Sequence, residues 1–269
     1  MGQARYLAAV AVGSMVFNLV YWVFGFLRMG TSGLTAQARG RRDMEEARRL
    51  LRRSQGMALA TSVLLVLFQW PLREVMFLLL GPTPDVLPLA KLYYRIVIWG
   101  APAMLGLYGL TGWFIGMQNT RLPMLISITQ NVVNILLSLV LVYVLGMKVE
   151  GVALGTVVAQ YAGFLMAIAL LGRYYKKVLS QKGISAPDRP HTTLLSSLFS
   201  FSAFLRVNRD IFLRTLCLVS VNLYFTAAGA RQGATILAVN ALLMQLLLLF
   251  SYVMDGFAYA GEALCGRYY

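Results

Sequence analysis

The feature of this sequence that most constrains its fold is a series of long apolar runs. A helix needs about 20 consecutive, mostly apolar residues to cross the hydrocarbon core of a bilayer. Runs of that kind occur at residues 6–28, 57–80, 92–117, 122–146, 151–174, 209–230 and 234–264. The chain is 59% hydrophobic and 13% charged, whereas soluble domains are about 45–50% apolar and about 25% charged. Because lipid offers no partners to backbone amides, we predict an all-α bundle of about seven transmembrane helices.

The basic residues are concentrated in every second connection between these runs. The connections at 39–53 and 172–191 hold seven and five of them, and Arg121 lies in a third, whereas the connections around 81–91, 146–151 and 230–233 hold one each. Basic loops stay on the cytoplasmic side. We therefore predict an integral plasma-membrane protein, in the inner membrane of a bacterium, with the N-terminus outside and the C-terminus in the cytoplasm. The net charge of +14 is thus a topology signal, and nucleic acid is not expected as a partner.

Several classes of protein are disfavoured by residues that the sequence lacks or isolates. Its one histidine, His191, lies in a polar loop, and its two cysteines, Cys217 and Cys265, do not have metal-ligand spacing. No GxxxxGK[ST] phosphate loop occurs, and no Ser/His/Asp set is available in the apolar runs. We therefore expect no enzymatic activity, no cofactor and no resident metal site. The N-terminal apolar run is also too long, and too poor in basic residues before it, for a signal peptide.

A cluster of helix-breaking residues divides the chain into two predicted units. Residues 183–195 (GISAPDRPHTTLL) contain helix breakers, so we predict a first bundle over 1–182, a cytoplasmic linker over 183–204 and the start of a second bundle over 205–269. A shift of 230 residues aligns 7–34 with 237–264, each a spanning run with a small-residue tail, and many transporters are built from two such halves. Residues 40–55 are predicted to form an amphipathic helix along the membrane surface.

The segment VMDGFAYAGEAL (253–264) carries two carboxylates, Asp255 and Glu262, at the end of an apolar run. Seven residues are about two helical turns, or roughly 10 Å, so the two acids share a face but do not share one proton. They line a cavity between the bundles, or they lie among headgroups and pair with basic residues such as Arg267. Tyr259 is placed to serve either acid. Gly256 and Gly261 are predicted to permit close packing or a bend.

Other polar residues within the apolar runs are weaker candidates. Asp210 and Arg214 have the i, i+4 spacing of an ion pair within a helix, which lowers the free-energy cost of burying charge. Arg28, near the end of the first run, is expected to extend toward the interface. The remaining amides and hydroxyls line a cavity or join helices through hydrogen bonds: Asn131, Asn134, Thr156, Gln160, Asn208 and Asn240.

Five motifs in order along the chain resemble the multidrug and toxic compound extrusion (MATE) family, and the last resembles its DinF-type branch. They are FGFLRMGTSGLTAQARG (24–40), FIGMQNTRLPM (114–124), NVVNILLSLVLVYVLGMKVEGVALGTVVAQY (131–161), NRDIFLRT (208–215) and MDGFAYAGEAL (254–264). The resemblance implies twelve helices in two six-helix lobes, of which this chain matches helices two to eight. The helix that carries the branch's main coupling acid is therefore expected to be absent.

The resemblance also implies a function. It implies an antiporter, coupled to H⁺ or Na⁺, that exports amphipathic or cationic toxic compounds by alternating access. The polar residues of the first lobe (Asn131, Asn134, Thr156 and Gln160) would then surround a Na⁺ or proton site, and the full-length protein is expected to be monomeric in the lipid membrane. A flippase for lipid-linked oligosaccharides and an inactive truncated membrane protein are the alternatives.

Overall fold

The computed structural model describes residues 2–180, 206, 208–221, 224–225 and 234–268, and the part described is helical apart from short turns. The helices are α1 (Gly2–Val23), α2 (Phe26–Gly40), α3 (Met44–Leu67), α4 (Gln69–Leu80), α5 (Leu87–Val97), η1 (Ile98–Gly100), α6 (Ala101–Gly116), α7 (Arg121–Leu139), η2 (Val140–Val144), α8 (Val149–Ser180) and α10 (Ala234–Tyr268). Residues 208–221 form a further helix. The all-α prediction is confirmed.

The predicted spans are largely found in the described residues. Five helical segments there are long and apolar enough to cross a membrane, and a sixth is the bent pair α3–α4, whose axes differ by 73°. The predicted run 209–230 extends beyond the described helix 208–221. Four turns in the described part of the chain have a local cause, because Arg42, Gln118, Gly81 and Gly146 adopt positive φ angles where the chain reverses or a helix ends.

Near the basic turn at residues 39–43, the structure adds one element and corrects one prediction. The added element is helix α2, which forms the small-residue tail after the first run and follows α1 after a short break at Phe24 and Gly25. Residues 40–55 do not form a separate surface helix, because α3 continues from Met44 to Leu67 without a break. Its start is capped by Asp43, whose carboxylate accepts a hydrogen bond from the Glu46 amide at 2.9 Å. The apolar face predicted for this segment is buried against α6 rather than against lipid headgroups.

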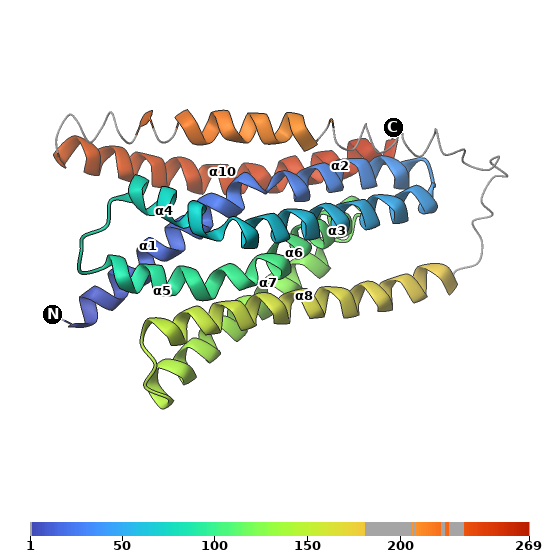
Figure 1. Cartoon of the computed structure of the whole chain (residues 1–269). Helices are drawn as coiled ribbons and strands as arrows, with labels where there is room; N and C mark the ends of the chain where they lie inside the picture. The colour runs from blue at the N-terminus through green and yellow to red at the C-terminus, as the bar shows by residue number, and fades with distance from the viewer. Residues whose placement is uncertain (1, 181–205, 207, 222–223, 226–233, 269) are drawn as a thin grey trace.

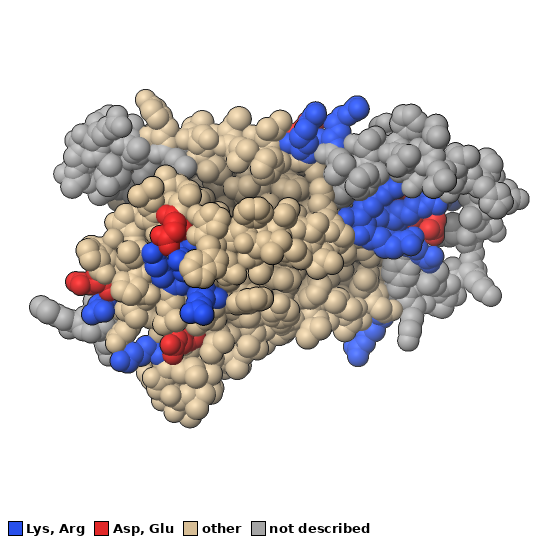
Figure 2. All heavy atoms as spheres, in the orientation of Figure 1, with Lys and Arg blue, Asp and Glu red and all other residues tan. Residues whose placement is uncertain are grey.

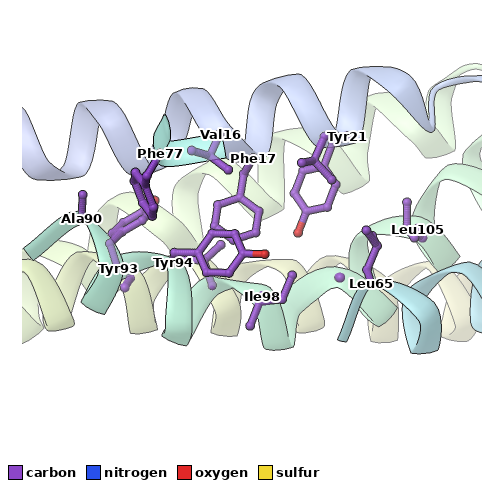
Figure 3. Packing of buried hydrophobic residues seen from close by; sticks show 14 of the residues in the cluster. Val16, Phe17, Tyr21, Leu65, Phe77, Ala90, Tyr93, Tyr94, Ile98 and Leu105 are labelled. Carbon is purple, nitrogen blue, oxygen red and sulfur yellow. The ribbon is translucent and has the colours of Figure 1, made fainter. Parts of the chain in front are cut away.

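Aromatic side chains form the core between α1 and α5. Phe17 of α1 stacks on Tyr94 of α5 with ring centroids 5.2 Å apart, and Phe77 of α4 meets the edge of the Tyr94 ring at 6.2 Å. Figure 3 shows Phe17 and Tyr21 projecting from α1 toward Tyr94 and Ile98. A second cluster joins α3, α6 and α7, and there the Trp113 indole donates a hydrogen bond to the carbonyl of Ala47 at 2.9 Å. These clusters hold α1 to α8 together as one bundle.

Charged residues gather at the two ends of the molecule, with a wide belt of uncharged surface between them (Figure 2). Large apolar side chains such as Leu78 (83% exposed), Tyr143 (81%) and Leu242 (69%) are open on the outside of the bundle. An apolar belt flanked by charge is what a bilayer requires of the surface that it contacts.

The helix at 208–221 and α10 lie along α2 at one edge of the bundle (Figure 1). The first copy of the internal repeat, 7–34, covers most of α1 and the start of α2, and the second copy, 237–264, lies within α10, so the two copies meet where α2 packs along α10. The segment predicted as the linker, 183–204, lies outside the described residues, and the predicted domain limits stay a prediction.

Candidate functional site: the junction between the two repeats

The junction between α2 and α10 contains a charged group. The Arg28 guanidinium of α2 donates a hydrogen bond through Nη2 to the Tyr259 hydroxyl of α10, with 2.6 Å between the two atoms. The Arg28 Cζ atom also lies 5.2 Å from the centre of the Tyr259 ring. Tyr108 of α6 lies within electrostatic range of both side chains. The bond joins residues 231 positions apart in the sequence and links the two repeats.

Small residues hold α2 in place on the side facing the first bundle. A Cβ atom on Gly112 of α6 would clash with the backbone carbonyl of Arg28, so glycine allows the two helices to approach each other here. On the other side, Asn208 is 2% exposed and its amide lies over Gly30 of α2. Phe212 of the same helix meets the Phe26 ring edge-on at 5.6 Å. Arg28 is therefore carried by a helix that is packed on both sides.

Arg28 lies deep within the apolar belt. It is twelve residues from Gly40, where the basic turn begins, which is about 18 Å along a helix. A charge at mid-bilayer costs about 2.5–3.5 kcal/mol on insertion scales, so such residues face the interior of a bundle and mark functional sites by default. The prediction that Arg28 extends to the interface is wrong, because its side chain turns toward α10. The distance from the basic turn was the signal that could have identified it.

Asp255 and Glu262 lie on one helix, α10, as predicted, but close packing of the flanking glycines against another helix is not seen. Asp255 is exposed, and a Cβ atom on Gly256 or Gly261 would have no neighbour within 4 Å. The prediction that these glycines permit close packing is wrong for the described residues, and α10 continues through both without a break. The Glu262 side chain lies outside the described side chains. Tyr259 bonds to Arg28, a partner that sequence reasoning did not anticipate.

The other second-lobe candidates lie apart from the Arg28–Tyr259 bond. Asp210 is exposed and pairs with Arg209 at 3.0 Å, so the predicted pair between Asp210 and Arg214 is wrong. An exposed ion pair contributes little to stability whichever partner forms it, so nothing favours Arg214 over the adjacent Arg209 as the partner of Asp210. Arg214 is exposed, and Asn240 is half-buried on α10.

The first-lobe candidates do not form one cluster. Asn131 and Thr156 donate hydrogen bonds to carbonyls of their own helices, at Ser127 and Val152. Asn134 accepts a hydrogen bond from Ser138 at 3.2 Å, one turn along α7. Three of the four residues therefore satisfy their side chains locally, and the described residues contain no group of three or more His, Cys, Asp or Glu that could hold a metal ion.

Gln160 differs from these three. It is 6% exposed, and its amide oxygen lies against Gly100. The Tyr21 hydroxyl of α1 lies within hydrogen-bonding reach of the Gln160 side chain of α8, and both groups are buried. Buried polar groups are nearly always paired, so these two side chains place a polar contact between α1 and α8 in an otherwise apolar core. Sequence reasoning found Gln160 and missed Tyr21.

Apolar helices long enough to cross a membrane, together with charged ends, define a polytopic helical membrane protein. Residues 3–140 match the MatE family model, and the chain belongs to the MatE family. Its members are transporters rather than enzymes, as predicted.

Two curated relatives and two solved structures illustrate the match. DNA damage-inducible protein F of Escherichia coli is 38% identical over 266 residues, which cover 98% of this chain and 56% of the relative. A probable multidrug resistance protein NorM of Acinetobacter baylyi is 28% identical over 73% of this chain and 44% of its own length. A MATE crystal structure in a bent conformation has a TM-score of 0.81 at 24% identity, covering 98% of this chain and 58% of that one. A MOP superfamily transporter from Pyrococcus furiosus has a TM-score of 0.77, also at 24% identity, over 97% and 57%.

These matches settle family and fold. The structural likenesses are below 25% identity and show the fold alone. The chain spans about half the length of the curated relatives it matches.

Proposed function

We propose that the protein takes part in the export of small amphipathic or cationic compounds in exchange for H⁺ or Na⁺. Support comes from membership of the MatE family and from relatives named as multidrug resistance proteins. The coupling ion is cargo in this scheme, so no cofactor is required. The basic turn at 39–43 supports a cytoplasmic location for that end of the bundle, with the α3–α4 bend on the outside.

The observation that carries the proposal is the Arg28–Tyr259 hydrogen bond between the two repeats. Transporters of this architecture work by rocking one lobe against the other, and contacts across the junction must then form in one state and break in another. The single bond between a long guanidinium side chain and a hydroxyl suits that task, because it can break without disturbing either helix. In this scheme the structure is the state in which the repeats are joined at this level.

Asp255 provides a route by which an ion can influence that bond. It precedes Tyr259 by one helical turn, about 6 Å along α10, and i and i+4 residues share a face. A deprotonated Asp255 attracts the Arg28 guanidinium away from the neutral hydroxyl, and a protonated one does not. Because Asp255 and Tyr259 both belong to α10, this ion pair replaces one contact across the junction by a stronger one. Release of the proton therefore favours the joined state, and binding of a proton favours separation, which is the differential binding that any coupling requires.

Tyr21 and Gln160 are the proposed ion-binding oxygens of the first lobe. Hydroxyl and amide oxygens are the ligands that hard cations such as Na⁺ accept, and these two oxygens are buried beside each other. Asn131, Asn134 and Thr156 are left out of this proposal because their bonds are made within or beside their own helices.

The proposal is tested by measuring export of ethidium from cells that lack their own multidrug exporters and express the protein. Such cells are expected to accumulate less dye than cells without it, and Asp255→Asn is expected to reduce export at least about tenfold, the loss that 1.4 kcal/mol of coupling free energy produces. The control is Asp210→Asn, which removes an exposed acid already paired with Arg209 and is expected to retain export.

Two outcomes contradict the proposal at different points. Unchanged export by the Asp255→Asn variant removes that carboxylate from the coupling mechanism. No export by the unaltered protein, when it is inserted and folded, rejects transport by this chain and favours the inactive alternative. Transfer of a lipid-linked oligosaccharide without dye export would support the flippase, which no observation on the described residues favours.

A further inference from the structure

A pocket at the end of the bundle opposite the basic turn lies outside the junction and outside the proposed ion site. Its volume is about 290 Å³, and it is lined by Gln69, Trp70, Arg73, Tyr94, Arg95 and Trp99. It forms because α4 leaves α3 at 73°, which opens a recess between the bend and the end of α5. Its floor is fixed by the Tyr94 hydroxyl, which donates a hydrogen bond to the Gln69 carbonyl at 3.2 Å. The recess is therefore part of the packed structure.

The depth of the pocket is set by the length of α3. From Arg53, the last residue of the basic connection, to the bend at Phe68, that helix rises about 22 Å, so the bend lies toward the far side of the hydrocarbon core from the basic residues. Two exposed tryptophans mark the same level: Trp70 is 68% exposed and Trp99 is 56% exposed. Tryptophan is enriched where hydrocarbon meets headgroups. The pocket thus opens at the headgroup level of one leaflet.

The pocket presents a prepared cationic surface. The Arg73 guanidinium lies 4.9 Å from the centre of the Trp70 ring, and its Nε and Nη2 atoms donate to Glu74 Oε1 at 3.1 and 2.8 Å. These contacts fix the guanidinium and leave Nη1 for another acceptor. Arg95 is exposed and has no hydrogen bond or ion pair in the described part of the chain. A planar guanidinium suits phosphate oxygens better than a point charge does.

Apolar surface adjoins the arginines on the membrane side. Leu67 and Phe68, directly before Gln69 at the end of α3, are 68% and 60% exposed. A soluble anion would use the guanidinium groups alone, whereas an amphiphile would also cover these side chains. We propose that this pocket binds the phosphodiester of an anionic phospholipid between Arg73 and Arg95, with the acyl chains along Leu67 and Phe68.

The test uses the purified full chain in dodecyl maltoside, with native mass spectrometry to count bound lipid and thermal unfolding to measure its effect. Dioleoyl phosphatidylglycerol is expected to bind and to raise the melting temperature, whereas dioleoylglycerol, which lacks the phosphate, is not. Arg95→Gln is expected to weaken phosphatidylglycerol binding about tenfold, because hydrogen bonds to a charged group contribute at least the equivalent of one decade in affinity. Arg95→Lys should lie between the two.

The control variant is Lys148→Gln, which removes an exposed cation that does not line the pocket. Lys148 directly precedes α8, and α8 begins at the end of the bundle opposite the basic turn (Figure 1). It is expected to bind the lipid as the unaltered protein does. Equal losses of phosphatidylglycerol binding in Lys148→Gln and Arg95→Gln would show that the lipid responds to general surface charge, and would overturn the proposed site. Full stabilisation by glycerol phosphate at the same concentration would assign the anion site to a soluble phosphate and overturn the lipid. Because Arg95 is exposed and carries no internal contact, its replacement tests binding without a folding defect.

Discussion

The two sides of α2 are built differently. Toward α6, α2 is met by glycines whose nearest neighbours are its backbone atoms: a Cβ atom on Gly116 would lie 2.5 Å from the Ser32 carbonyl oxygen. Toward the helix at 208–221, a Cβ atom on Gly30 would meet the far end of a side chain, the Asn208 amide, at 2.6 Å. Backbone cannot move aside without moving a helix, whereas a side chain can rotate. The first interface is therefore rigid, and the second is able to open.

The polar groups of the two interfaces follow the same division. Between α2 and α3, the Thr31 hydroxyl donates to Ser54 at 2.8 Å, and both side chains are fully buried. At the junction, the Arg28–Tyr259 bond joins two partly exposed side chains. Buried pairs are lost only when the fold is lost, whereas a half-buried pair can exchange its partner for water or another side chain. A lobe that moves as one body needs fully buried pairs within it and half-buried pairs at its edge.

The largest effect is expected for Gly116→Ala, which attacks the rigid side. The added methyl group would lie 2.5 Å from the Ser32 oxygen and 2.6 Å from Thr35 Cβ, so α2 and α6 must separate. We expect a loss of about 2–3 kcal/mol in unfolding free energy, which is typical of overpacking. Thermal unfolding in detergent measures it, and Gly172→Ala, where a Cβ atom has no neighbour within 4 Å, is the matched control. Equal melting temperatures for both variants would contradict a rigid α2–α6 interface.

A smaller effect, confined to the junction, is expected for Tyr259→Phe. The change removes the acceptor of the Arg28 hydrogen bond but keeps the ring, and bonds to charged groups contribute about 1.5–3 kcal/mol. The population with separated repeats should therefore rise about tenfold or more. Electron–electron distance measurements between spin labels at Leu154 and Val253, both exposed, detect it after Cys217 and Cys265 are replaced. The melting temperature of the first lobe should not change. An unchanged distance distribution would show that this bond does not hold the repeats together.

The features of the fold that depend on composition and length, such as the membrane spans, could be predicted from the sequence. Apolar runs of sufficient length located six of seven spans in the described residues, because a bilayer imposes that length on any helix that crosses it. The shift of 230 residues paired the start of α2 with the second half of α10, and these two helices pack together. Family motifs identified the fold, because they span nearly the whole chain.

The sequence did not predict which side chains meet. Arg28 was assigned to the interface because a long cation near the end of a run usually extends outward, and nothing local to it indicates Tyr259, 231 residues away. Gly112 and Gly256 look alike in sequence, yet one lies against a backbone and the other faces open space. The start of α3 has the pattern of a surface helix, because a helix with one polar face is amphipathic whether lipid or α6 covers its other face.

Ser54→Ala is expected to have a modest effect within the rigid side. It removes the acceptor of the Thr31 hydroxyl, and hydrogen bonds between membrane helices contribute about 0.6 kcal/mol on average, with a maximum of about 1.7. We expect a loss of about 1 kcal/mol, since both side chains are fully buried. The control is Ser220→Ala, whose exposed hydroxyl bonds to Leu216 of its own helix. A cost at Ser220 as large as that at Ser54 would mean that loss of a hydroxyl, rather than of an interhelical bond, is measured.

The smallest effect, with the opposite sign, is expected for Gly261→Ala on α10. No atom lies within 4 Å of the added methyl group, and alanine is favoured over glycine in a helix by about 0.5–1 kcal/mol. A slight rise in the melting temperature is therefore expected where the same substitution at Gly116 lowers it. A drop comparable to that of Gly116→Ala would show that this face of α10 is packed against another helix in the membrane. In that case α10 would be held on both of its sides, and the movable contact between the repeats would have to lie elsewhere.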